Sequence, residues 1–322
     1  MISCRNNHML ARAREARFQP NLFVQILLFV LLFMVGNAIS SVILVILIMI
    51  AIFSNPQLIS AMVSGDPGAV DASFSATMAV LEGPGFMLGS LLVTAVTTLV
   101  CIFYCCKLEE RPLASMGFRK PGWFVRYLKG YAIGTGMLLL CALILWLMGD
   151  LSFAFAENIP VLFILAFFVG FVIQGMSEEV LVRGYFMVSL NNRCHTAVAV
   201  AISSVAFAML HLGNPGISVL ALVNLTLYGV FMAVYVLRTD DLWGACAIHS
   251  AWNFAQGNLV GIRVSGTILL PSVAVMQPLG EQDLFHGGDF GLEGGLIVTI
   301  VTLAAIALTL FLPQKEQEAA AL

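Results

Sequence analysis

The sequence predicts an all-α fold, a polytopic membrane helix bundle with about eight transmembrane helices. The first observation behind this prediction is the composition: of 322 residues, 60% are hydrophobic and 10% are charged, with a mean hydropathy of +0.97. A soluble domain has about 25% charged residues, so this chain lacks the polar side chains to cover a water-exposed surface. The second is that the apolar residues form runs of about 18 or more, which is enough to cross a bilayer as a helix.

Each apolar run is expected to form one membrane helix. The runs lie at 22–53, 85–106, 130–149, 160–189, 196–212, 217–237, 243–262 and 294–312. The first run exceeds the roughly 20 residues that one crossing requires, so we expect a helix that tilts or extends beyond the membrane. A hairpin inside this run would place the basic loops on both sides of the membrane, and it is therefore not expected.

Basic residues predict the orientation of the helices, because loops rich in Lys and Arg remain on the cytoplasmic side. With the N-terminus inside, all but two of the 15 Lys and Arg residues fall in cytoplasmic segments, including Arg5 and Lys315 near the termini. The exceptions are Arg183, within a span, and Arg263, outside. The outer loops carry acidic residues instead: Asp66, Asp71, Glu82, Asp150 and Glu157. The pattern predicts that both termini are cytoplasmic.

The chain is expected to divide into an N-terminal cytoplasmic arm with the first two spans (1–106), a core (107–312) and a polar C-terminal tail (313–322). Its seven cysteines form no CxxC pair and avoid the outer segments, which argues against a zinc knuckle and a disulfide framework. The sequence has no basic groove with interleaved aromatic residues, so no nucleic-acid partner is expected. It leaves the oligomeric state open.

Ionisable side chains inside the spans are candidate functional residues, because a charge near the bilayer centre costs at least about 2.5–3.5 kcal/mol. Glu179 and Arg183 have the i,i+4 spacing of a favourable helical ion pair. Glu178 points about 100° away from Glu179 and is expected to face a cavity as a free carboxylate, which suits a general base. The alternative is that both acids serve one buried salt-bridge network, although two acids and one Arg leave a charge unbalanced.

Two histidines and an asparagine add to these acids. His211 ends its predicted span four residues after Phe207, and a lone His there could equally cap the helix or meet solvent. His249 and Asn253 are also four residues apart, so both project from one helix face. That spacing suits two groups that grip a metal, a water or an oxyanion, with a helix–helix hydrogen bond as the alternative. Together with Glu178, these residues predict a water-activating centre.

The expected depths of the two histidines disagree. At 1.5 Å per residue, His249 lies roughly 9 Å from the cytoplasmic end of its span near Trp243, whereas His211 lies more than about 20 Å from Thr196. The two can meet only if the helices tilt or if the boundary near Thr196 is wrong. Because Glu178 and His249 fall in the inner half, we expect a cavity that opens toward the cytoplasm or laterally into lipid.

At these residues the chain resembles the CPBP family, which comprises CAAX proteases and bacteriocin-processing (Abi) proteins. The family pattern EExxxR, FxxxH and HxxxN occurs here as Glu178-Glu179 with Arg183, Phe207 with His211, and His249 with Asn253. The flanking stretches 111–118 and 287–294 also resemble bacterial members, so we expect the plasma (inner) membrane of a prokaryote. The resemblance covers roughly 107–296 and implies that the core is an intramembrane peptidase.

The resemblance implies an endopeptidase that uses water rather than a covalent nucleophile. Without a metal, Glu178 and His211 would activate the water while His249 and Asn253 stabilise the oxyanion, with Glu179, Arg183 and Phe207 in supporting roles. With a zinc ion, His211 and His249 would be ligands and Glu178 would lie near them. The metal-free version is favoured, because the sequence has no HExxH helix and Asn is a poor zinc ligand.

The expected substrate is a membrane-associated or lipidated peptide or protein, reached from the membrane or the cytoplasmic side. The first alternative is a catalytically weak homologue that acts by binding, in bacteriocin immunity or membrane signalling. The second is a proton-coupled transporter, because intramembrane Glu and His also form proton relays. A transporter predicts repeats or paired broken helices, and the sequence shows neither.

Overall fold

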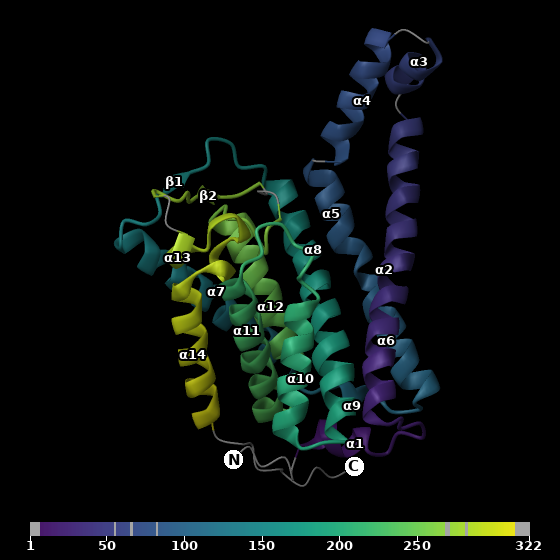
Figure 1. Ribbon diagram of the computed structural model, residues 1–322, viewed down its shortest axis with the longest axis vertical. Coiled ribbons are helices and arrows are strands. Elements are labelled where there is room, and N and C mark those ends of the chain that lie inside the picture. The colour runs from purple at the N-terminus through teal and green to yellow at the C-terminus, as the bar shows by residue number, and fades with distance from the viewer. Residues whose placement is uncertain are drawn as a thin grey trace.

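The computed structural model describes residues 7–54, 56–64, 67–81, 83–267, 271–280 and 283–312, which form a helical bundle with one small sheet (Figure 1). The α-helices are α1 His8–Ala13, α2 Leu22–Phe53, α3 Pro56–Ser64, α4 Pro67–Leu81, α5 Pro84–Val93, α6 Ala95–Phe103, α7 Trp123–Leu147, α8 Val161–Glu179, α9 Val188–Asn191, α10 Thr196–Met209, α11 Val219–Thr239, α12 Trp243–Phe254, α13 Asp283–His286 and α14 Leu296–Phe311. Strands β1 Ala154–Phe155 and β2 Ala274–Val275 pair antiparallel. The predicted helical architecture is confirmed.

Each predicted span contains a helix, although the helices differ in length. Among the described residues, five helical segments are long and apolar enough to cross a membrane: Leu22–Phe53, Pro84–Leu108, Trp123–Leu147, Val161–Asn191 and Val219–Thr239. The shorter apolar helices α10 and α14 occupy two further predicted spans. The remaining predicted span, 243–262, contains α12 and its π-helical continuation Ala255–Leu259. The structure therefore supports a multi-pass membrane protein, while eight complete crossings and cytoplasmic termini stay predictions.

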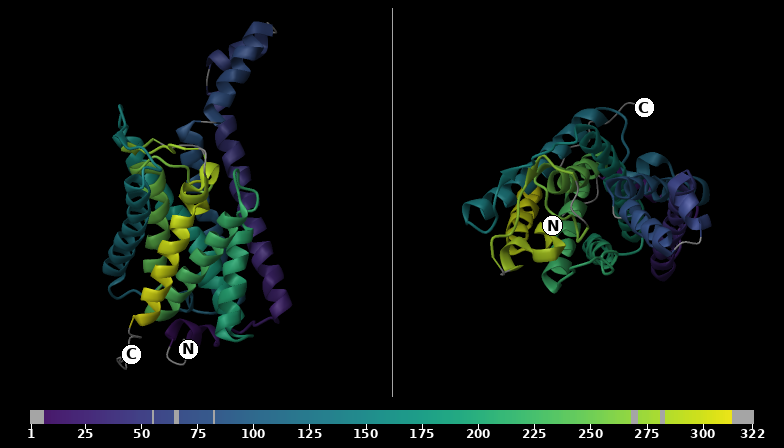
Figure 2. Two further views of the ribbon diagram at one scale, coloured as in Figure 1. Left: turned by 60° about the vertical axis from the view of Figure 1, so that its left-hand side comes forward. Right: turned by 90° about the horizontal axis from the view of Figure 1, so that it is seen from above.

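The first apolar run is one continuous helix, as predicted. The Asn21 side chain caps α2 by accepting a hydrogen bond from the backbone amide of Val24. The next segment, expected to be an acidic outer loop, forms α3 and α4 instead, each beginning at a proline, which suits the first helical turn. Asp71 lies in α4, whereas Asp66 and Glu82 lie outside the described residues. The end of α2 and helices α3 and α4 form an arm that projects past the bundle, while α5 lies beside α8 (Figures 1 and 2).

Helices α7 and α12 approach each other closely at two glycines. A Cβ atom added to Gly130 would lie 2.2 Å from the carbonyl oxygen of Gly244, and one added to Gly134 would lie 2.3 Å from that of Ile248. Small residues four apart are a common way for membrane helices to pack backbone against backbone. Because α12 carries His249, this contact fixes the position of a candidate catalytic residue.

Gly134→Ala is expected to destabilise the protein by about 1–3 kcal/mol, because its methyl group must push α7 away from α12. The control is Gly136→Ala on the same helix, where an added Cβ meets nothing within 4 Å. The measurement is thermal unfolding of the purified protein in detergent. Equal midpoints for the two variants would contradict the close contact.

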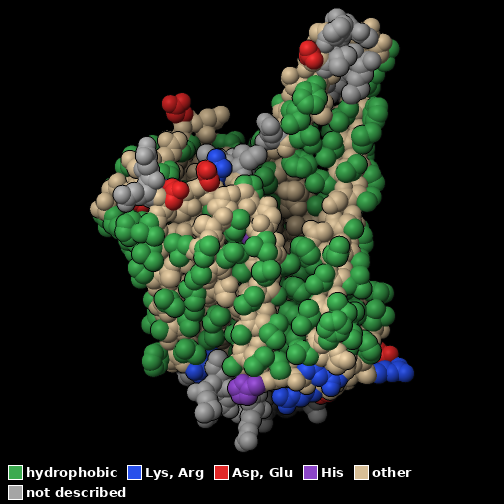
Figure 3. Space-filling view, in the orientation of Figure 1, with side chains coloured by type: hydrophobic (Ala, Val, Ile, Leu, Met, Phe, Trp, Pro, Cys, Tyr) green, Lys and Arg blue, Asp and Glu red, His purple; other side chains and the backbone are tan. Residues whose placement is uncertain are grey.

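One end of the bundle, where α1 and the last turn of α14 lie, is closed. We call it the basic end, because Lys and Arg side chains gather there, and the opposite end the far end (Figure 3). Met9 and Leu10 of α1 are at most 2% exposed and Ala13 is fully buried. Leu242, just before α12, is also fully buried and donates its backbone amide to the carbonyl of Gly117 at 3.0 Å. Helix α1 and the segment around Gly117 therefore cover the start of α12.

Candidate active site

The two acids lie in the last turn of α8, in the middle of the helical span Val161–Asn191. The chain continues from α8 as the π-helix Val180–Met187, all of whose residues are buried. Glu179 is fully buried, whereas the Glu178 side chain is 26% exposed. A π-helical segment in a membrane helix is a frequent mark of a functional site, because it shifts the side chains that follow it.

Glu179 holds two partners at once. Its Oε1 lies 2.8 Å from Nη1 of Arg183, so the ion pair expected from the i,i+4 spacing is present. The same oxygen lies 2.9 Å from Nδ1 of His249, a contact that the sequence did not predict. Arg183 also donates to the carbonyl of Gly229, and its guanidinium lies 4.6 Å from the ring centroid of Phe207. Glu179 therefore fixes the imidazole of His249 from within the bundle.

Glu178 points into a cavity, as the helical geometry predicted, but its carboxylate is not without a partner. Its Oε1 accepts a hydrogen bond from the amide of Gln174 at 2.5 Å, and its Oε2 lies 3.6 Å from Nε2 of His249. Gln174 Oε1 in turn accepts a hydrogen bond from Nδ2 of Asn253 at 2.9 Å. Sequence reasoning missed Gln174. The available signal was an amide four residues before Glu178, on the same face of an apolar helix.

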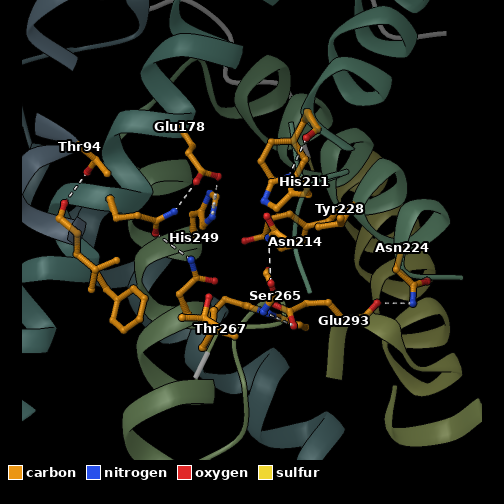
Figure 4. Close-up of a pocket in the computed structure, with 18 of the residues that line it drawn as sticks. Thr94, Glu178, His211, Asn214, Asn224, Tyr228, His249, Ser265, Thr267 and Glu293 are labelled. Carbon is orange, nitrogen blue, oxygen red and sulfur yellow. Dashed lines mark hydrogen bonds and ion pairs between the residues drawn. The ribbon is translucent and has the colours of Figure 1, made fainter. Parts of the chain in front are cut away.

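His211 reaches the same cavity from the residues that follow α10. Its Nδ1 lies 2.9 Å from the backbone carbonyl oxygen of Phe207. A carbonyl oxygen only accepts hydrogen bonds, so this contact places the ring proton on Nδ1 and leaves Nε2 as an acceptor. His211 can therefore both bond to the last turn of its helix and take part in the site. Figure 4 shows His211 across the cavity from Glu178 and His249.

A cavity of about 250 Å³ brings the predicted residues together. Glu178, His211, His249 and Asn253 all line it, with Phe207 beside them. Tyr228 adds an aromatic wall, its ring centroid 5.7 Å from that of His249. Glu179 and Arg183 lie behind this lining and make contact with it through His249 and Phe207. The catalytic roles of these residues stay predictions.

The start of α12 explains how two histidines at different expected depths share one cavity. Helix α10 begins at Thr196, so the predicted boundary is not the cause. Leu242 is fully buried, and the ring of Trp243 packs against Phe118 with centroids 4.8 Å apart. Helix α12 therefore begins inside the bundle, beneath α1, rather than at the membrane surface. His249 lies deeper than its position within the helix indicates.

The cavity lies on the far-end side of Glu179 rather than on its basic-end side, and the expected opening, toward the cytoplasm or laterally into lipid, stays a prediction. On α8 the lining residues are Phe171, Gln174 and Glu178, which all precede Glu179 and so lie toward the far end. From Glu179 to Asn191, in the direction of the basic end, the helix is buried throughout. The expected lateral opening is compatible with α5, which forms one wall of the cavity.

The site residues do not form a metal-ligand cluster as they are arranged. Among the described residues, no group of three or more His, Cys, Asp and Glu side chains is placed to hold a metal ion. Nδ1 of His249 faces Glu179, and Nδ1 of His211 faces a carbonyl, so each ring has only Nε2 to offer. Catalytic zinc sites use three protein ligands, and the two Nε2 atoms and the Glu178 carboxylate are not placed together as such a group. No step proposed below uses a metal.

Glu293, which precedes α14, forms a second polar region of the cavity wall that the sequence did not reveal. Its Oε2 accepts a hydrogen bond from the Gln256 amide at 2.5 Å, and its Oε1 lies 3.2 Å from Oγ of Ser265. Burial raises the pKa of the Glu293 carboxyl above its usual value. These contacts anchor the loop after α12 against the start of α14 (Figure 4).

Comparison with known proteins agrees with the geometry. Residues 160–255 match the family described as type II CAAX prenyl endopeptidase Rce1-like. The matched segment runs from α8 to α12 and contains all three motifs. No curated protein and no solved structure matches the chain. Residues 160–255 therefore form a domain of the Rce1-like type II CAAX prenyl endopeptidase family, and the resemblance that the motifs carried is confirmed.

Proposed function

We propose that the protein is an intramembrane endopeptidase that hydrolyses a peptide bond with a water activated by Glu178 and His211. The observation that carries this proposal is the cavity, where a partly exposed carboxylate, two imidazoles and the amide of Asn253 face one another within an apolar bundle. Ionisable groups in such a place are costly, so their presence favours a function. The Rce1-like domain supports peptidase activity.

Charge balance favours a protonated His249. Glu178 and Glu179 bring two negative charges into one connected set of contacts, and Arg183 brings one positive charge. His249 contacts both carboxylates, Glu179 through Nδ1 and Glu178 through Nε2. An imidazolium makes the set neutral, and both of its N–H groups then face acceptors. It also places a positively charged donor at the cavity wall.

The water would bind between Glu178 and His211. Oε2 of Glu178 has no hydrogen-bond partner among the described residues, and Nε2 of His211 is an acceptor. Glu178 takes one proton from the water, whose oxygen bonds to the carbonyl carbon of the peptide. The carbon–nitrogen bond then breaks, and the leaving nitrogen receives that proton from Glu178. The Gln174 amide holds the carboxylate in the orientation that this transfer requires.

The negative charge on the tetrahedral intermediate needs donors on the same wall. Nε2–H of His249 supplies one of them. Asn253 gives one N–H to Gln174 and keeps its second for the oxyanion. The cavity wall is otherwise largely apolar, with Met87, Leu91 and Trp252 beside the polar groups, which supports a membrane-associated or lipidated peptide as substrate.

Substrate trapping with Glu178→Gln tests the proposed function. The full-length variant is expressed in native membranes, recovered with its bound peptides, and compared with wild type and with membranes that lack the protein. We expect the variant to retain peptides whose cleaved forms accumulate with wild type. A trapped set identical to that of the empty membranes would reject the peptidase function and favour a role in binding, such as immunity or signalling.

A further inference from the structure

We propose that the catalytic cavity admits its substrate from the far end of the bundle, so that the peptide is cut at the extracytoplasmic side of the membrane. The identity of the incoming molecule as a substrate rests on the peptidase function proposed above. The access route rests on the level of the cavity within the bundle, on the loops that line it and on the closed basic end.

The lining residues of α8 end at the middle of its helical span, and the other helices line the cavity with the parts toward the far end. Helix α8 runs from the far end toward the basic end, and it contributes Phe171, Gln174 and Glu178 but no residue after Glu178. The helical span Pro84–Leu108 runs in the same direction and contributes residues between Met87 and Thr94, which lie in its first half. The cavity therefore occupies the half of the bundle that adjoins the far end.

Loops of the far end take part in the cavity wall. Asn214 follows α10, Ser265 and Thr267 follow α12, and all three line the cavity. The side chain of Asn214 donates to the carbonyl oxygen of Ser265 at 2.9 Å, which ties the two loops together. Of the described residues in the segments at the basic end (7–20, 104–122, 188–195 and 238–243), none lines the cavity.

Among the described residues, the basic end offers no comparable route. Behind Glu178 lie the buried ion pair of Glu179 with Arg183 and the buried helix that continues to Asn191. Beyond them, a Cβ atom added to Gly117 would lie 2.9 Å from Leu242 and 2.9 Å from the sulfur of Met9. A peptide entering from this end would have to displace α1 and break that packing.

The half-exposed lining residues define the mouth. Ser90, Thr94, His211 and Asn214 are each partly exposed, and Figure 3 shows a hollow between the projecting arm and the rest of the bundle. Ser90 lies six residues after Pro84, so it is only about 9 Å below the start of its helical span. The mouth thus lies near the far-end start of this helical span. A juxtamembrane peptide segment, extended at the membrane surface, fits this position.

The side of the membrane follows from charge. Basic residues mark the cytoplasmic face of a membrane protein, so the far end faces away from the cytoplasm. The expected substrate class is therefore the extracytoplasmic juxtamembrane segment of a membrane-bound peptide or protein. The sequence alone predicted access from the cytoplasm or laterally from the membrane.

Cysteine accessibility tests the route in intact cells that express the full chain. Ser90→Cys places a thiol in the cavity, and the exposed Lys120→Cys places one at the basic end. A small membrane-impermeant cationic methanethiosulfonate is applied before and after permeabilisation, with wild type measuring the reaction of native cysteines. We expect Ser90→Cys to react at least tenfold faster than Lys120→Cys in intact cells, and Lys120→Cys to react only after permeabilisation.

Two outcomes would overturn the proposed access route. One is a Ser90→Cys thiol that reacts only after permeabilisation, and the other is a thiol that reacts under neither condition. Asn214→Cys at the rim provides a second position and guards against a local effect of one substitution. The labelling needs no catalysis, so its failure leaves the peptidase function standing. Conversely, if the trapping experiment rejected the peptidase function, a positive labelling result would still show that the cavity is reached from the far end.

Discussion

Glu178→Gln is expected to lower kcat for peptide hydrolysis by about 10²- to 10⁴-fold, the usual contribution of a general base. The amide has nearly the size of the carboxylate, so it can remain beside Gln174 and His249 while being unable to take a proton from water. KM should change little, because substrate contacts stay in place. The measurement is single-turnover cleavage, by purified protein in lipid, of a peptide recovered by trapping.

The matched control is Glu157→Gln, an exposed glutamate between α7 and α8 that lies away from the cavity. It should cleave at the wild-type rate. Glu178→Asp should recover part of the lost activity, because it restores the carboxylate at a longer distance from the water. A Glu178→Gln protein with wild-type kcat would remove Glu178 from the mechanism.

Arg183→Met is expected to destabilise the protein by about 3–5 kcal/mol, because it leaves the set of Glu178, Glu179 and protonated His249 with one uncompensated negative charge inside the bundle. Both members of the Arg183–Glu179 pair are fully buried. The substitution also removes the guanidinium that lies over Phe207 and the hydrogen bond to the carbonyl of Gly229. Without Arg183, the Glu179 carboxylate keeps only its contact with His249, so the ring of His249 is oriented less firmly. Thermal unfolding in detergent measures the first effect and peptide cleavage the second.

An exposed ion pair in the same chain provides the comparison. Arg12 lies 3.6 Å from Glu15 with side chains 43% and 60% exposed, and such surface pairs contribute about 0–1 kcal/mol. Arg12→Met should therefore leave the unfolding midpoint nearly unchanged. The double variant Glu179→Gln with Arg183→Met should recover stability relative to Arg183→Met alone, because it no longer buries a lone charge. If Arg183→Met unfolded at the same temperature as Arg12→Met, the buried pair would not stabilise the bundle.

The helices and the motif positions could be predicted because they depend on local pattern. A run such as 22–53 has no other favourable place than the membrane, and it forms one helix. The angle between Glu178 and Glu179 follows from helical geometry alone, and their side chains do point to different partners. The division into 1–106, 107–312 and 313–322 stays a prediction, and the tail 313–322, with Lys315, lies outside the described residues, as does Arg5.

What sequence reasoning missed depends on contacts between distant segments. One example is the way α1 and the residues around Gly117 cover the start of α12, because no local pattern shows that covering. Gln174 was overlooked because a neutral amide costs less in a membrane than a charge, so it does not stand out. Glu293 lies in a predicted loop, where a carboxylate looks ordinary until folding buries it.

The closure of the basic end also bears on how the protein is made. Met9 donates its backbone amide to Asp240, a residue 231 positions later in the chain. A ribosome therefore delivers α1 long before its acceptor exists, and α1 must wait while the intervening helices enter the bilayer. His249 follows Asp240 by only nine residues, so the closing contact and the second histidine of the cavity emerge together. A nascent chain thus cannot assemble the complete set of catalytic groups until most of the protein has been translated.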